Sequence, residues 1–161
     1  MALDPEFVAD CPYGPGGLLI DDIIELDPDN SRVVVRMPTH TDLPLTREQR
    51  THPERHPAHV SGGLMVHMTG MVGFVHAYYI LGLRHSEGWI GYGVRVHDAR
   101  FSKLASPGEP MELEGKAVRV RRIRGQIFAR YTFQFRQGGE VVYEGEQTAV
   151  WENVKDRAAT A

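Results

Sequence analysis

The hydrophobic and polar positions of the chain group into six segments with the character of β-strands. Three consecutive valines, Val33, Val34 and Val35, show the enrichment in β-branched residues that is typical of strands. Turn-forming residues separate the segments at 27–30, 106–109, 124–125 and 138–139. The predicted strands cover residues 18–26, 32–37, 88–101, 111–123, 126–136 and 140–151.

One long apolar segment stands between the second and third predicted strands. Ser61 is a suitable N-cap, and the pattern predicts a helix from there to about Gly82. The segment is long enough to raise the question of a membrane span. His67 and His76 interrupt it, together with glycines and tyrosines, and this favours a helix buried inside a globular domain.

The order of two strands, one helix and four strands predicts an α+β fold. A long antiparallel sheet with a single apolar helix must bury that helix against one of its faces. We expect a lead-in over residues 1–13, one domain over 14–152 and a polar tail over 153–161. The edge strands predict pairing with a second copy, as a homodimer or a dimer of dimers.

Composition narrows the function classes. The 161 residues suffice for one domain with a real core, and the net charge of −3 disfavours nucleic-acid binding. A single cysteine, Cys11, excludes an intrachain disulfide and a four-cysteine zinc site. The first residues lack a basic region followed by an apolar one, so no secretory signal and a cytoplasmic location are expected, without a membrane partner.

The most informative stretch is rich in histidine and proline. Residues 38–60 are long for a loop and contain His52 and His56, and His67 follows on the first turns of the predicted helix. Imidazoles ordinarily titrate near neutral pH, so this arrangement is suited to proton transfer.

Four motifs resemble the FabA/FabZ family of β-hydroxyacyl thioester dehydratases. They are the opening segment 17–27, the loop His52-Pro53-Glu54-Arg55-His56-Pro57, the pair Ser61-Gly62, and segment 99–109. Their shared order extends over roughly residues 14–152. The resemblance implies the hot-dog fold, in which the sheet wraps around the central helix. It also implies an acyl thioester of coenzyme A or acyl carrier protein as substrate, with no cofactor and no metal.

The resemblance also implies a catalytic pair. The first histidine of the family's loop motif is catalytic, which points to His52 as the base. The second catalytic residue lies five positions after the motif glycine, Gly62, and corresponds to His67, where the family has a carboxylic acid. His67 would then hold or protonate the C3 hydroxyl. Backbone N–H groups of Gly62, Gly63 and Leu64 at the helix N-terminus would stabilise the charge that develops on the thioester carbonyl.

Further residues are candidates for contacts with the substrate. Met68 and Met71 would line the acyl pocket, and His56 would shape the loop. Arg100 and Lys103 would contact an acidic carrier protein or the phosphates of coenzyme A. The arginines at 119, 121, 122 and 124 are either a solvated hairpin tip or part of the same contact.

Other functions remain open from the sequence. A hot-dog thioesterase commonly has a carboxylate on the helix, about where Gly70 stands here, so the acid would have to come from Asp42 or Glu54 on the loop. A non-catalytic acyl-binding protein is a further alternative.

A metal site is the remaining alternative. His52, His56, His59 and His67 would be its ligands. Pro53 and Pro57 disfavour it, because they break the helix that would align such ligands.

Overall fold

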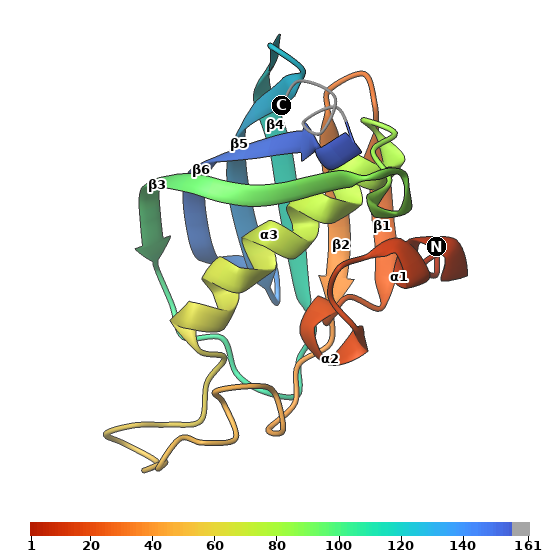
Figure 1. The fold of residues 1–161 in the computed structure, drawn as a ribbon. Helices are drawn as coiled ribbons and strands as arrows, with labels where there is room; N and C mark the ends of the chain where they lie inside the picture. Colours follow the sequence, from red (N-terminus) through yellow and green to blue (C-terminus); the bar gives the residue numbers. More distant parts are fainter. Residues whose placement is uncertain (156–161) are drawn as a thin grey trace.

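The computed structural model describes residues 1–155, which form one antiparallel sheet and a central helix (Figure 1). Six strands are arranged in the order β1-β2-β4-β5-β6-β3. The strand bounds are β1 Asp22–Asp27, β2 Arg32–Met37, β3 Trp89–Phe101, β4 Met111–Ile123, β5 Gln126–Gln137 and β6 Glu140–Asn153. The predicted α+β hot-dog architecture is confirmed.

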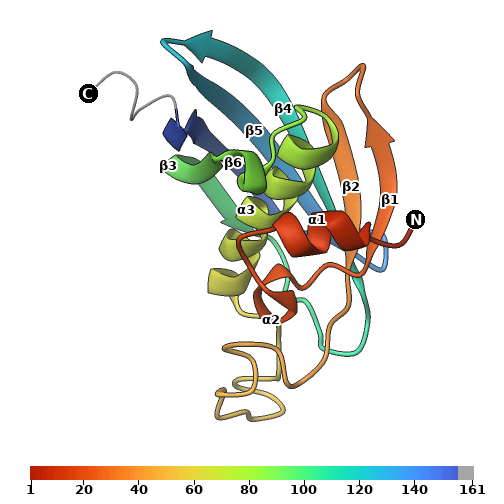
Figure 2. The ribbon, with the colours of Figure 1, turned by 45° about the vertical axis from the view of Figure 1, so that its right-hand side comes forward.

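Helix α3, Gly62–Tyr79, lies in the hollow of the curved sheet (Figure 2). Ser61 caps it, because its side chain accepts a hydrogen bond from the N–H of Gly63. Val72 and Val75 on the helix and Leu113 on β4 are fully buried where helix and sheet meet. The helix is therefore the centre of the core. None of the helices among the described residues is long and apolar enough to cross a bilayer.

Two tight hairpins connect the long strands. Arg124 and Gly125 join β4 to β5 with φ values of 51° and 80°, and Gly138 and Gly139 join β5 to β6 with 57° and 79°. Two successive residues with positive φ are the signature of a turn whose twist matches that of the flanking strands. These turns were predicted from the sequence and are confirmed.

The N-terminal segment differs from the prediction. Residues 18–21 are not strand, because Pro15 starts a short helix, α2 (Pro15–Leu18), that ends at Leu19 in a left-handed conformation. Strand β1 begins only at Asp22. The preceding helix α1, Pro5–Asp10, buries Phe7 against Tyr78, with ring centroids 5.0 Å apart. The lead-in is thus part of the core. Residues 156–161, most of the predicted tail, lie outside the described residues.

Strand β3 is an exposed edge of the sheet. It pairs with β6 on one side and has no strand partner among residues 1–155 on the other. Tyr92, Val94, Val96 and Phe101 are each about half exposed along it. A long edge with exposed apolar side chains can serve as a template for pairing with a strand of another chain.

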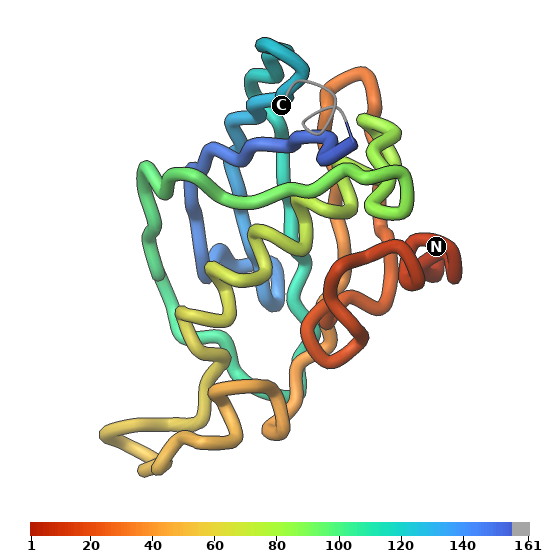
Figure 3. The backbone as a smooth tube through the Cα atoms, in the orientation of Figure 1, coloured from red at the N-terminus to blue at the C-terminus, as the bar shows by residue number. Residues whose placement is uncertain are grey.

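The loop over residues 38–60 extends away from the sheet near the start of α3 (Figure 3). Its base is ordered by buried Leu43 and by hydrogen bonds around His59. The side chain of Gln49 donates to the His59 carbonyl at 2.9 Å and accepts from the His59 N–H at 3.1 Å. The loop is therefore anchored at its base, and its outer part carries His52 and His56.

Candidate active site

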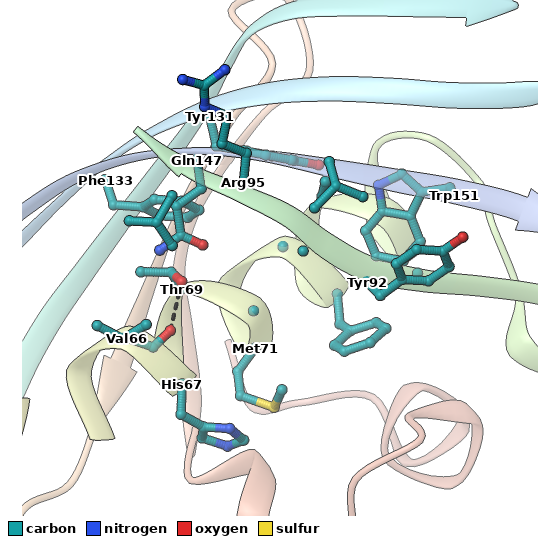
Figure 4. A pocket seen from close by; sticks show the side chains of 18 of the residues that line it. Val66, His67, Thr69, Met71, Tyr92, Arg95, Tyr131, Phe133, Gln147 and Trp151 are labelled. Atoms are coloured by element: carbon teal, nitrogen blue, oxygen red, sulfur yellow. Dashed lines mark hydrogen bonds between the residues drawn. The ribbon is translucent and has the colours of Figure 1, made fainter. Parts of the chain in front are cut away.

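A cavity of about 690 Å³ lies between α3 and strands β3, β5 and β6. One side is formed by a face of α3 that includes two glycines, Gly70 and Gly73, and the opposite side by β3 (Figure 4). A Cβ added at Gly70 or Gly73 would meet no atom within 4 Å, so both glycines widen the cavity. Aromatic rings form much of the remaining wall: Tyr13, Phe74, Tyr92, Tyr131, Phe133 and Trp151.

His67 lines this cavity from the second turn of α3. Its Nε2 lies 2.7 Å from the carbonyl oxygen of Gly17, in α2. A carbonyl can only accept a hydrogen bond, so Nε2 carries the proton in the neutral ring and Nδ1 keeps its lone pair. The ring of Tyr13 packs edge-on against the imidazole at 5.1 Å. The contacts therefore fix His67 in a tautomer that can accept a proton at Nδ1.

His52 lies elsewhere, in the loop. It forms an isolated β-bridge with His56, in which the two backbones exchange hydrogen bonds of 2.7 and 3.0 Å. The His52 Nδ1 accepts from the backbone N–H groups of Glu54 and Arg55 at 3.2 and 3.1 Å. Since N–H groups only donate, the neutral ring carries its proton on Nε2. His52 is thus prepared to donate a hydrogen bond. It does not line the cavity that His67 lines.

The N-terminus of α3 is close to the strand edge. A Cβ at Gly62 would lie 2.9 Å from the ring of Phe101, so only glycine fits there without a shift. The N–H of Gly63 donates to Ser61 Oγ at 3.3 Å, and Leu64 is buried. The capping bond therefore already uses one of the three N–H groups proposed from the sequence.

The other predicted contact residues are divided between core and surface. Met71 lines the cavity, whereas Met68 is buried in the core without lining it. His56 packs against His59 on the loop. Arg100 and Lys103 are exposed and form ion pairs with Asp98 and Glu140.

The cavity contains no carboxylate. None of its lining residues is Asp or Glu, and both Asp42 and Glu54 are exposed on the loop. In the described part of the chain, no three His, Cys, Asp or Glu side chains are grouped closely enough to hold a metal ion. Proton transfer inside the cavity would accordingly depend on His67.

His76 occupies a different environment farther along α3. It is fully buried, with Nδ1 2.9 Å from the Tyr131 hydroxyl and Nε2 2.8 Å from Ser31 Oγ. Burial lowers the pKa of His76 from 6.5 to about 4, so the ring is neutral at pH 7. This neutral ring connects the helix to β5 and to the turn between β1 and β2.

Sequence reasoning missed the part of the cavity formed by β5 and β6, including Tyr131, Gln147 and Trp151. A signal was present on β6. Its residues 145, 147, 149 and 151 share one face with period two, and Gln147 is the polar exception among Gly, Ala and Trp. A glutamine among inward-facing positions indicates a polar cavity.

The sheet wrapped around one central helix defines the class of protein, the hot-dog fold. Solved structures of similar fold include the dehydratase heterocomplex ApeI:P from Xenorhabdus doucetiae, with a TM-score of 0.65 and 13% identity over 98% of this chain and 97% of that one. A thioesterase from Haemophilus influenzae aligns with a TM-score of 0.62 and 15% identity over 96% and 94%. These likenesses establish the fold.

The family follows from sequence relatives. No family model matches the chain. The 3-hydroxyacyl-[acyl-carrier-protein] dehydratase FabZ of Roseiflexus castenholzii is 31% identical over 141 residues, covering 88% of this chain and 90% of the relative. FabZ of Xylella fastidiosa is 31% identical over 125 residues, covering 78% and 73%. The chain belongs to the FabZ family of 3-hydroxyacyl thioester dehydratases.

Proposed function

We propose that this protein catalyses the reversible dehydration of a 3-hydroxyacyl thioester. The names of its FabZ relatives favour acyl carrier protein over coenzyme A as the carrier. The observation that carries the proposal is the tautomer of His67: its Nε2 faces the carbonyl of Gly17, which leaves Nδ1 to accept a proton in a cavity that has no carboxylate.

The reaction needs one proton removed and one delivered. Nδ1 of His67 takes the proton from C2, the electron pair forms the C2–C3 double bond, and the C3–O bond breaks. The departing hydroxide takes up a proton and leaves as water. In the reverse direction, the same groups add water to the enoyl thioester.

We assign the second histidine a donor role. The Nε2–H of His52 is suited to hold or protonate the C3 oxygen, because its Nδ1 is already occupied by two backbone N–H groups. The tautomers thus favour His67 as the base and His52 as the donor, the reverse of the roles suggested by the sequence. Backbone N–H groups at the start of α3 would stabilise the charge on the thioester carbonyl.

The two histidines would meet across a homodimer. His52 does not line the cavity of its own chain, and one wall of that cavity is β3, the exposed edge of the sheet. Pairing of two β3 edges would bring a second copy of the loop to the cavity mouth. In this arrangement, each site takes His67 from one copy and His52 from the other.

Mixing two inactive variants tests the shared site. If His52→Ala and His67→Gln chains exchange partners, one site in four contains both histidines, so about a quarter of the activity returns. Sites formed within one chain would give no recovery on mixing.

The activity itself is tested with purified protein and separate 3-hydroxyacyl, enoyl and saturated acyl thioesters. Loss or gain of water without release of thiol is expected. His67→Gln should lower the rate by about 10²- to 10⁴-fold, the usual contribution of a general base. His85→Gln is the matched control, because His85 is exposed in a short 3-10 helix, His85–Glu87, outside this cavity. Release of thiol, or full activity in a folded His67→Gln protein, would contradict the proposal.

A further inference from the structure

The cavity is widest where both of its sides lack large side chains. On the helix side, Gly70 and Gly73 stand about one turn apart on α3, and an added Cβ at either would meet no atom within 4 Å. On the sheet side, Gly93 of β3 is paired with Ala149 of β6, and both line the cavity. A Cβ at Gly93 would also meet no atom within 4 Å. We call the region between these four residues the recess.

The register of the sheet places larger residues on both sides of the recess. Alternation puts Gln147, Ala149 and Trp151 on the inner face of β6. On β5, Tyr131 is paired with Gln147 and Ala129 with Ala149. Successive residues on one face of a strand are about 6–7 Å apart. The row of small residues therefore lies between a row that contains Tyr131 and a row that contains Trp151.

The rings that border the recess are held in position by their neighbours. Trp151 packs edge-on against Phe74, with ring centroids 5.3 Å apart. The indole also covers the backbone of Gly91, where an added Cβ would lie 2.0 Å from it. On the other side, the rings of Tyr131 and Phe133 are stacked at 5.6 Å, with an angle of 20° between their planes. All four rings line the cavity, so the recess has aromatic borders.

The recess lies beyond the reacting group along the helix. Gly70 and Gly73 follow His67 by three and six residues on α3, which is about 4.5 and 9 Å along the axis at 1.5 Å per residue. The cavity follows the helix as far as Phe74, and Figure 4 shows Trp151 well apart from His67 in its wall. A substrate that reacts at His67 and extends along this cavity would place the part of its acyl chain beyond C3 in the recess.

We propose that the recess holds an aromatic ring carried by the acyl chain beyond C3. The inference rests on the proposed function and names its substrate class: 3-hydroxyacyl thioesters that end in an aryl group, in preference to plain alkyl chains. The missing side chains leave room for a group wider than a row of methylenes. A ring placed there would meet the aromatic borders, and such pairs gain energy beyond the area they bury. A narrow alkyl chain would fill the recess only in part and would lose dispersion contacts.

Selectivity among three matched substrates tests the recess. The probes are 3-hydroxyacyl pantetheine thioesters with the same number of carbons, which carry a phenyl ring on C5, a cyclohexyl ring on C5, or an unbranched alkyl chain. The wild-type kcat/KM should be highest for the phenyl probe. Its advantage over the cyclohexyl probe should be about 2- to 10-fold, the effect of one aromatic contact.

Two glycine variants test the width of the recess. Gly70→Ala and Gly73→Ala each add one methyl group to it, and should lower the preference for the phenyl probe over the unbranched probe by about 10-fold or more. Both added methyl groups have open space, so the variants should remain folded, which urea unfolding checks. Gly16→Ala is the matched control. Gly16 is exposed in α2, outside the cavity, and its added methyl group also meets no atom within 4 Å, so the preference should not change.

A separate pair of variants tests the aromatic borders. Phe74→Leu removes the ring that packs against Trp151 and should lower the preference for the phenyl probe over the cyclohexyl probe by about 2- to 10-fold. Phe128→Leu, on β5 and outside the cavity, should leave that preference unchanged. A wild-type enzyme that processes the phenyl and unbranched probes equally, or glycine variants that retain the full preference, would overturn the recess. Absence of turnover with all three probes would instead count against the proposed function.

A binding measurement decides the recess without turnover. The ligands are amide analogues of the phenyl and unbranched probes, which lack the 3-hydroxyl group and cannot react, and calorimetry gives their dissociation constants. The phenyl analogue should bind more tightly to the wild-type protein, and Gly73→Ala should reduce that difference by about 10-fold or more. Equal affinity of the two analogues, or a difference that Gly73→Ala leaves intact, would refute the proposed ring site even if the enzyme is active.

Discussion

The buried imidazole of His76 makes stability sensitive to mild acid. Its pKa is about 4 in the folded protein and 6.5 as the ordinary value for the unfolded chain. Between these values, the unfolded state binds more protons than the folded state, so stability falls as the pH falls below about 6.5. From pH 7 to pH 5, this one group should remove about 2 kcal/mol from the free energy of unfolding.

Urea unfolding of wild type and His76→Gln at pH 7 and pH 5 isolates the contribution of His76 to the free energy of unfolding. The range from pH 5 to pH 7 lies above the ordinary pKa values of Asp carboxyls. The pKa values of Asp10, Asp22 and Asp27 are lowered further, so these groups contribute little to the change in stability over this range. Glutamine retains an amide that can bond to Ser31 but does not titrate. The variant should be less stable at pH 7, yet lose about 2 kcal/mol less than wild type on acidification. An equal loss in both proteins would refute the reasoning.

Four further substitutions probe the fold around the site, each measured by urea unfolding. Gly91→Ala should destabilise the protein by about 1–3 kcal/mol, because its Cβ would lie 2.0 Å from the Trp151 ring. Gly70→Ala places its Cβ in open space and should leave the stability unchanged or higher. A Gly70→Ala protein less stable than Gly91→Ala would contradict this packing. Ser61→Ala removes the cap of α3 and should cost about 1 kcal/mol, and no change would argue against the capping bond. Leu113→Ala removes a fully buried side chain and should cost about 2–5 kcal/mol. A smaller loss would mean that the surrounding core relaxes into the space left by the side chain.

Local patterns in the sequence were sufficient for most of the fold. Strand β4, Met111–Ile123, was predicted to the residue, because alternation and β-branched residues run up to a glycine turn. Ser61 identified the start of α3 for a similarly local reason. Leu18 was misassigned, because its apolar neighbours Leu19 and Ile20 resemble a strand, while Pro15 at the first helical position favours a short helix.

The site was less accessible to sequence reasoning, because its parts meet only through the tertiary fold. The motif pointed to His67 but could not give its tautomer, which depends on the carbonyl of Gly17, 50 residues away. Alternation places Trp151 on the inner face of β6 but cannot distinguish a packed core from an open cavity. The cavity exists here because Gly70 and Gly73 lack side chains on the facing helix.

The most direct test of the proposed dehydratase chemistry is to incubate the protein with an enoyl thioester in water labelled with oxygen-18 and locate the label by mass spectrometry. The proposed reaction adds the label to C3 and leaves the thioester intact, and His67→Gln slows the incorporation by about 10²- to 10⁴-fold. Label in a free carboxylate, with thiol released, would show hydrolysis of the thioester and contradict the assignment.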